Sequence, residues 1–293
     1  MNVAIVTDSN SGITPQLAKE WGVTVIPMPF LIDGEEYYEE VNLSQGEFYE
    51  KLFAEAELST SQPNIYAVKE IWDELLTKYE EIVHIPMSSA LSASCETALN
   101  FAKEYNGKVQ VVDNKRISIT QKESVRDAIK LAKIGKTAKE IKDYLEENSM
   151  QASIYIMVNT LKYLKKGGRI TPAAAAIGSL LKIKPVLTIQ GGKLDKFCQV
   201  MGVGPGKKRM LEQMVKDITT RFATQLKNGN LRIMMAYTYN RTKCEEFMAE
   251  ANALLQQYGV QVDYMDPLSL SVSCHIGDGA IAIACCEYLK TEQ

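Results

Sequence analysis

The sequence predicts an α/β fold, with an N-terminal, mostly parallel sheet flanked by helices and a C-terminal α/β two-layer domain. The chain has 293 residues, which exceeds the size at which a single hydrophobic core keeps growing. Short apolar runs alternate with amphipathic segments of helical period, a pattern typical of strands joined by helices. The segments become longer and differently arranged near residue 152. We therefore expect two domains, 1–152 and 153–293, the second closing over the first.

The first half begins with a buried strand at Val3–Val6, which polar turn-forming residues end. A helix is expected from Pro15, since proline is favoured in the first turn of a helix. The same alternation continues to the end of this half. It predicts strands at Val23–Ile26, Ile82–Ile85 and Val109–Asp113, and helices at Phe48–Phe53, Tyr66–Tyr79, Ser92–Tyr105, Ser118–Ile134 and Ala138–Ser149.

The second half has fewer, longer elements. Apolar runs predict strands at Ser153–Val158, Val186–Ile189, Leu231–Tyr237, Val260–Met265 and Ala280–Cys285, and helical periodicity predicts helices at Lys207–Leu226 and Thr242–Tyr258. A further helix is expected at Thr171–Leu181, where four alanines follow Pro172. Such small side chains let a neighbouring helix approach or leave space for an apolar ligand.

Composition excludes several classes of protein. Lys and Arg total 33 against 36 Asp and Glu, without a basic block, which argues against nucleic acid as a partner. No apolar run reaches the roughly 18 residues that span a bilayer, and no signal peptide is expected, so we predict a cytoplasmic protein without stable membrane anchoring. Two histidines and six cysteines without metal-binding spacing predict no metal site.

Polar groups follow several predicted strand ends, where ligands bind in open α/β sheets. They share the ability to donate hydrogen bonds, from hydroxyls, a guanidinium, an imidazole and the backbone N–H groups of Gly277 and Gly279. Such a set suits a small anion, although Ser92 and Thr60-Ser61, each taken singly, are better explained as ordinary helix caps. The segments are Thr60–Pro63, Ser88–Ser92, Gly167–Arg169 and His275–Gly279.

An enzyme that handles phosphate or nucleotide is the alternative. It would use Asp8, after the first strand, and the glycine-rich turn Gly202–Gly206. Asn10 stands where an aspartyl-phosphate phosphatase would place a second carboxylate for Mg²⁺, and the turn lacks the Walker spacing. A serine hydrolase is disfavoured too, because no Gly-x-Ser-x-Gly segment is present.

Taken in order, these segments resemble the DegV family, which includes the fatty-acid-binding subunits of bacterial fatty acid kinase. The likeness covers the whole chain. Its motifs are Asp8-Ser9, Thr60-Ser61-Gln62-Pro63, Ser88-Ser89-Ala90-Leu91-Ser92, Val112-Asp113-Asn114, Gly167-Gly168-Arg169-Ile170, Lys184-Pro185-Val186-Leu187 and His275-Ile276-Gly277-Asp278-Gly279.

The resemblance implies a bacterial carrier that encloses a long-chain fatty acid in an interior tunnel and performs no chemistry itself. It places the carboxylate on Thr60 or Ser61, on Ser92 and on His275, with Arg169 as the nearby positive charge. It implies no cofactor besides the fatty acid, and a separate fatty acid kinase subunit that phosphorylates the carboxylate. A regulatory lipid-sensing protein without a kinase is the remaining alternative.

The sequence departs from the family pattern at four places. Ala93-Ser94-Cys95 replaces Gly-Thr-Tyr after Leu-Ser, and Asn114 replaces a common serine. Gln199 and Met201 stand where the family often has two cations, which bears on the kinase partner. Asp278 replaces a proline, and its carboxylate would repel a bound carboxylate unless it is protonated, faces away or orients the imidazole of His275. We expect it to orient the imidazole, and a different ligand head group is the alternative.

Overall fold

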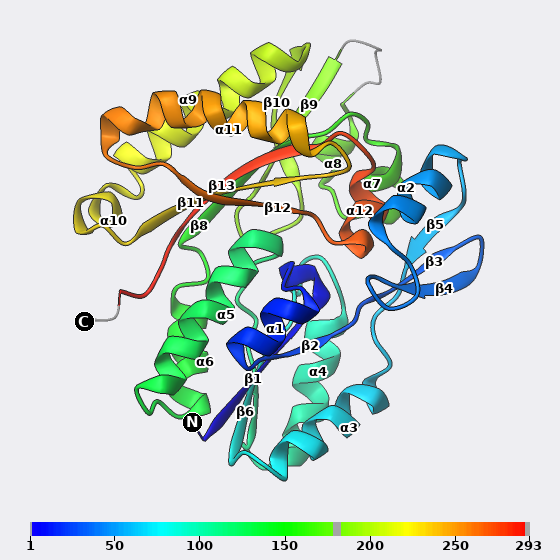
Figure 1. Ribbon diagram of the computed structural model, residues 1–293, viewed down its shortest axis with the longest axis vertical. Coiled ribbons are helices and arrows are strands. Elements are labelled where there is room, and N and C mark those ends of the chain that lie inside the picture. Colours follow the sequence, from blue (N-terminus) through cyan, green and yellow to red (C-terminus); the bar gives the residue numbers. More distant parts are fainter. Residues whose placement is uncertain (1, 178–182, 291–293) are drawn as a thin grey trace.

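The computed structural model describes residues 2–177 and 183–290, and these residues form three sheets. Figure 1 shows a parallel sheet with its helices in the lower part of the view and a larger sheet with its helices above. A small third sheet lies to one side. The predicted α/β fold class is confirmed, while the division at residue 152 stays a prediction.

The first sheet is parallel, with the strand order β2-β1-β6-β7. Alternate residues of β1 pack on opposite faces: Val3 and Ile5 contact one core, Ala4 and Val6 the other. Helices therefore cover both faces. The elements are β1 (Val3–Asp8), β2 (Thr24–Ile26), β6 (Glu81–Ile85), β7 (Val109–Val111), α1 (Pro15–Trp21), α3 (Ile65–Leu76), α4 (Ser94–Ala102), α5 (Ser118–Lys133) and α6 (Ala138–Glu147), with 3-10 turns η1 (Ser9–Ser11) and η2 (Lys103–Tyr105).

The second sheet has six strands in the order β10-β9-β8-β13-β11-β12, and only the pair β11–β12 is parallel. Helices α9 and α11 cover its outer face (Figure 1). Its elements are β8 (Ala152–Met157), β9 (Ile183–Ile189), β10 (Asp195–Met201), β11 (Leu231–Tyr237), β12 (Val262–Pro267), β13 (Ile281–Glu287), α7 (Lys162–Gly167), α8 (Pro172–Ala175), α9 (Val203–Thr219), α10 (Ala223–Asn228), α11 (Arg241–Leu255), η3 (Gln256–Tyr258) and α12 (Leu270–Ile276).

The third sheet is antiparallel and joins the two halves of the chain. Its order is β4-β3-β5, formed by Glu35–Tyr38, Pro29–Ile32 and Leu58–Thr60. With α2 (Gln45–Phe53) it packs on α12, so that Phe30 and Phe48 share a core with Leu270 and Cys274. A segment of the first half is thereby fixed to the second.

Charged groups on α5 also hold the two large sheets together. The Lys122 ammonium lies 2.6 Å from the carboxylate of Asp266 on β12. The buried carboxylate of Glu123 lies 2.7 Å from the guanidinium of Arg232 on β11 and accepts a hydrogen bond from the hydroxyl of Tyr264. The Lys122 and Glu123 side chains are almost fully buried. Removing the partner of either one would therefore leave an unpaired charge in the interior.

Two predicted helices differ from the structure. The helix expected at Lys207–Leu226 is two helices, because α9 ends at Thr219 and α10 begins at Ala223. Of the helix expected at Thr171–Leu181, α8 covers Pro172–Ala175, and residues 178–182 lie outside the described residues. The sequence also gave no expectation of β3, β4, β5, β10, α7 or α12.

Candidate functional site

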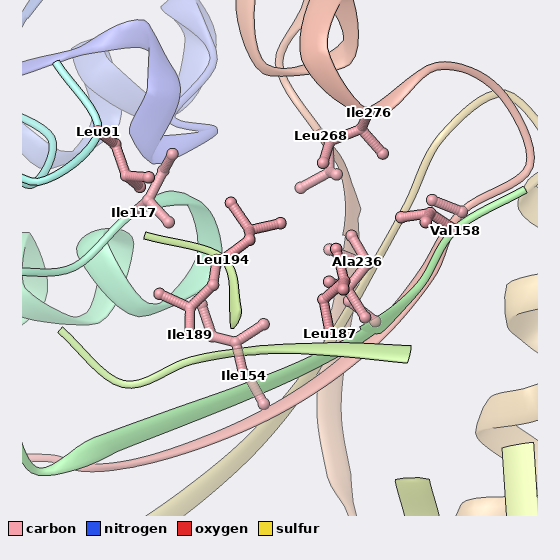
Figure 2. Close-up of a cluster of buried hydrophobic side chains, with 14 of the residues drawn as sticks. Leu91, Ile117, Ile154, Val158, Leu187, Ile189, Leu194, Ala236, Leu268 and Ile276 are labelled. Carbon is pink, nitrogen blue, oxygen red and sulfur yellow. The ribbon is translucent and has the colours of Figure 1, made fainter. Parts of the chain in front are cut away.

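A cavity of about 190 Å³ lies between the parallel sheet, the six-stranded sheet and α12. Most of its wall is apolar. Figure 2 shows Leu91 and Ile117, from the first half, on the side opposite Ile154 and Ile189 of the six-stranded sheet. The apolar lining residues are Met28, Met87, Leu91, Ala93, Ile117, Ile119, Ile154, Ile156, Leu164, Ile189, Leu194, Ala236, Leu268, Val272, Ile276 and Ala282.

Strand alternation supplies one wall of this cavity. Ile154 and Ile156 of β8 line it, whereas Tyr155 and Met157 point to the opposite face and pack under α9. Ala236 of β11 and Ala282 of β13 also face the cavity, and their small side chains leave it open there. The inner face of the sheet is therefore the floor of a binding space.

A polar group of side chains lines one part of the same cavity. Thr60, Ser61, Ser92, Arg169 and His275, all predicted from the sequence, lie on its wall together with Gln62. Ser61 and Gln62 are exposed, so this part of the wall reaches solvent. The structure thus brings together five of the seven predicted ligand-binding residues, from the end of β5 and three other segments.

Thr60 and His275 form the central pair. The Thr60 hydroxyl lies 2.9 Å from Nε2 of His275, which sits in the last turn of α12. Burial, and then the nearby charge of Arg169, lower the pKa of His275 from 6.5 to about 4. The imidazole is therefore neutral near pH 7, with one nitrogen a donor and the other an acceptor.

Arg169 supplies the positive charge beside this pair. Its Nε donates to the carbonyl oxygen of Leu91 at 3.1 Å, and its Nη1 donates to the carbonyl oxygen of Gly167. Two backbone carbonyls thereby fix the guanidinium plane at the cavity wall. Its remaining N–H groups have no acceptor among the described residues and can donate to an anion.

Ser92 is not the N-cap of α4, as was considered for it, because the N-cap is Ala93. The Oγ of Ser92 accepts a local hydrogen bond from the backbone N–H of Ser94 at 3.2 Å. The hydroxyl also lines the cavity. Since Oγ is the acceptor in the bond to Ser94, its own hydrogen is available to a ligand.

Gly277 and Gly279 lie outside the residues that line the cavity. The N–H of Gly277 donates to the carbonyl oxygen of Ser273 at 2.8 Å, which ends α12. Gly279 adopts a φ of 67°, and a Cβ there would meet the Asn159 amide. Both glycines shape the turn after His275 and are not placed to donate to the cavity.

Asp278 does not orient His275. The carboxylate and the carbonyl oxygen of Asp278 both accept from Nδ2 of Asn159, at 3.4 and 3.1 Å. Nδ1 of His275 instead lies over Gly167, where an added Cβ would come within 2.2 Å of it. Close packing on a glycine, together with the hydrogen bond to Thr60, positions the imidazole.

The groups considered for phosphate chemistry are placed differently. The buried carboxylate of Asp8 accepts from the N–H of Met87 at 2.7 Å, the N–H of Asn10 at 3.0 Å and the side-chain amide of Gln121 at 3.2 Å. Burial raises its pKa to about 6. Gly202–Gly206 is the start of α9 and lies apart from the cavity. Asp8 instead links the ends of β1 and β6. Within the part of the chain that the structure describes, no contact places Asp8 and the Gly202–Gly206 turn in one site.

Three buried polar residues on the cavity wall had not been predicted. Asn10, Ser118 and Ser271 are all buried and line it. Ser271 precedes His275 by four residues, the spacing that places two residues on one helix face, but α12 itself was not expected. Among residues 2–177 and 183–290, no group of three or more His, Cys, Asp or Glu could hold a metal ion, and no helix is long and apolar enough to cross a membrane.

An apolar cavity with one polar part, enclosed between the two large sheets, is typical of a small-molecule-binding protein. A family model described as "Uncharacterised protein, DegV family" matches residues 2–288. A DegV domain-containing protein of Deinococcus radiodurans is 32% identical over 285 residues, which cover 97% of this chain and 98% of that protein. The chain belongs to the DegV family.

Solved structures agree with this assignment. A DegV family protein from Thermus thermophilus, described as fatty acid binding, superimposes with a TM-score of 0.83 at 26% identity over 98% of this chain and 100% of the other. DegV from Bacillus subtilis, described as a fatty acid binding protein, gives 0.82 at 26% identity over 98% and 99%. The fatty acid binding DegV family protein of Streptococcus agalactiae gives 0.84 at 25% identity over 99% and 100%.

Proposed function

We propose that this protein is a carrier that encloses one long-chain fatty acid, with the acyl chain in the apolar cavity and the carboxylate at the polar part. The observation that carries the proposal is the position of Thr60, Ser92, Arg169 and His275 on the wall of a cavity whose other lining residues are mostly apolar. The relatives described as fatty acid binding have the same fold over almost their whole length.

The chemistry of the wall matches the two ends of such a ligand. Each methylene removed from water contributes about 0.8 kcal/mol, so the acyl chain supplies most of the affinity. A carboxylate cannot enter a low-dielectric site without charge-assisted partners. Arg169 offers a fixed cation, and Ser92, Thr60 and His275 offer neutral donors within the same part of the wall.

The wall around the proposed carboxylate is partly open, which would give another protein access to the head group. Thr60, Ser92 and His275 are half-buried, and Ser61 and Ala93 beside them are exposed. A separate kinase could therefore reach the head group while the acyl chain stays enclosed. We propose that the protein presents the carboxylate in this way and performs no chemistry on it.

The proposal is tested by identifying what the purified protein carries. Native mass spectrometry of protein expressed in bacteria should show the mass of the chain plus about one fatty acid, because an apolar cavity of this size attracts an apolar occupant. Extraction with organic solvent should recover the same acid. Folded protein that carries no fatty acid and takes none up from added stearate would refute the carrier function.

Phosphorylation of the bound fatty acid by a kinase is tested separately, with the lipid-loaded protein, ATP and a fatty acid kinase subunit from the same organism. Acyl-phosphate should form only when both proteins are present. Acyl-phosphate formed by the loaded protein alone would show that it is an enzyme. Stable lipid binding without turnover by any partner would favour a regulatory lipid sensor.

A further inference from the structure

A cluster of polar side chains occupies part of the cavity wall that should contact only acyl chain. Oδ1 of Asn10 accepts hydrogen bonds from the hydroxyl of Ser269 at 3.0 Å and from that of Ser271. Asn10 is 2% exposed, and Ser271 also lines the cavity. Two serines on α12 and the segment before it therefore hold an amide from the first half in one orientation.

The donor side of this amide is poorly satisfied. Among the described residues, the one acceptor for Nδ2 of Asn10 is the Met87 sulfur, at 2.8 Å. A thioether is a weak acceptor, and an amide has two N–H donors. A buried amide that lacks partners is costly, which makes Asn10 a candidate to bind a polar atom inside the cavity.

Ser118 adds a second polar atom to the same wall. It is 6% exposed and lines the cavity, and its hydroxyl has no hydrogen-bond partner among the described residues. Its φ of 55° lies in the left-handed region, which is unfavourable for a residue with a Cβ. Helix α5, which Ser118 begins, packs on the turn that carries Asn10.

The cluster lies near the proposed carboxylate but is separate from it. Ser271 precedes His275 by one turn of α12, which corresponds to about 6 Å along the helix axis. An acyl chain bound with its carboxylate beside His275 would pass Asn10 within its first several carbons. A polar group on that part of the chain could meet the cluster.

We propose that the cavity is built to take hydroxylated long-chain fatty acids, with the acyl hydroxyl bound at Asn10 and Ser118. A hydroxyl both donates and accepts, so it can accept from Nδ2 of Asn10 and pair with the Ser118 hydroxyl. Plain acyl chains would leave these groups without partners. The inference rests on the proposed carrier function and adds to it a preference among fatty acids.

The test compares delipidated wild-type protein binding stearate with its binding of hydroxystearic acids that carry the hydroxyl near the carboxylate, in mid-chain or near the methyl end. One gained hydrogen bond should make the dissociation constant about tenfold lower for an isomer with the hydroxyl near the carboxylate. Isomers with the hydroxyl near the methyl end should bind more weakly than stearate, since their hydroxyl enters the apolar part.

Two variants assign the preference to the cluster. The preference is the dissociation constant for stearate divided by that for the hydroxystearic acid with its hydroxyl near the carboxylate. In Asn10→Leu and in Ser118→Ala, this ratio should fall toward one. Asn100→Leu, at an exposed position of α4, is the matched control and should keep the wild-type ratio. If Asn10→Leu fails to fold, Ser118→Ala and the wild-type isomer series still decide.

The outcomes separate this inference from the carrier function. Wild-type protein that binds stearate but prefers no hydroxylated isomer would overturn the hydroxyl site alone. A preference that both variants retain would also overturn it. Protein that binds neither stearate nor any hydroxystearate would overturn the carrier function.

Discussion

The Thr60 hydroxyl lies 2.9 Å from Nε2 of His275, although 215 positions separate the two residues in the sequence. Thr60 ends a strand of the small sheet, and His275 lies in the last turn of a helix from the second half. The small sheet is what makes this contact, because it carries a segment of the first half to α12.

Gly167→Ala should displace the His275 imidazole. The added Cβ would lie 2.2 Å from Nδ1, so the ring must move and lose its hydrogen bond to Thr60. We expect fatty acid binding to weaken by about tenfold, as for the loss of one hydrogen bond to a charged group. Gly204→Ala is the control, since a Cβ there meets nothing within 4 Å. Equal affinities for the two variants would contradict the role of this packing.

Ser92→Ala should weaken fatty acid binding by about tenfold or more, because it removes a donor to a carboxylate. It also removes the acceptor for the N–H of Ser94, so the free energy of unfolding should fall by up to about 1 kcal/mol. Ser89→Ala is the matched control, since that exposed hydroxyl donates to Asp113 outside the cavity. An unchanged dissociation constant in Ser92→Ala would remove Ser92 from the site.

Binding of a fatty acid should raise the pKa of His275 from its value of about 4. A carboxylate close to the imidazole favours its protonated form, and thereby opposes the effects of burial and of Arg169. Titration of the imidazole by NMR, in delipidated and in loaded protein, measures the change. His84 is an internal reference, since it lies outside the residues that line this cavity. A pKa that is equal or lower in the loaded protein would contradict the proposed position of the carboxylate.

Ala236→Leu should shift the preference toward shorter fatty acids. Ala236 lines the cavity from the inner face of β11, so a larger side chain would take up space otherwise open to the acyl chain (Figure 2). We expect the dissociation constant to rise more for stearate than for a medium-chain acid, measured side by side. The melting temperature of the variant controls for overpacking, which would destabilise the fold. An equal loss for both acids would place the acyl chain elsewhere.

Acid should destabilise the protein through His84. Burial lowers the pKa of this histidine to about 3. Its ring packs edge-on against that of Trp72, with the two ring centroids 5.6 Å apart. Because the unfolded chain takes up the proton near pH 6.5, stability from neutral His84 is complete above that pH and is lost as the pH falls toward 3. The loss between about pH 7 and about pH 4 should be roughly 3 kcal/mol.

His84→Phe keeps a ring beside Trp72 and removes this titration, so its unfolding free energy should fall less with acid than that of the wild type. Asp8 and Asp127 titrate in the opposite sense, because burial raises the pKa of each to about 6. The difference between variant and wild type isolates His84 from them. Chemical denaturation at several pH values gives that difference, and parallel curves would contradict the assignment.

Sequence patterns predicted the elements that have strong periodicity, and they failed where tertiary contacts decide. Strands β1, β8 and β13 of the two large sheets contain apolar runs, and β11 matches its predicted range in full. The small sheet has strands of only three or four residues. Strand β4 is Glu-Glu-Tyr-Tyr, in which polar and apolar residues do not alternate. Such strands form because α2 and α12 cover them.

The same limit applies to the site. Ser-Val-Ser-Cys-His is poor in helix-forming residues and no helix was expected there, so the spacing of Ser271 and His275 could not be interpreted. Family motifs located five ligand-binding candidates on the cavity wall. They did not indicate Asn10 or Ser118, whose significance depends on which buried atoms have partners and therefore on coordinates.

The alternation of β8 separates two kinds of constraint on the chain. Tyr155 and Met157 belong to a densely packed core under α9, while Ile154 and Ile156 face a space that a ligand would fill. Substitutions on the inner face can therefore change which molecule fits, while the outer face continues to hold the sheet and its helices together. A fold divided in this way can diversify its cargo through inward-facing residues of a few strands without rebuilding its scaffold.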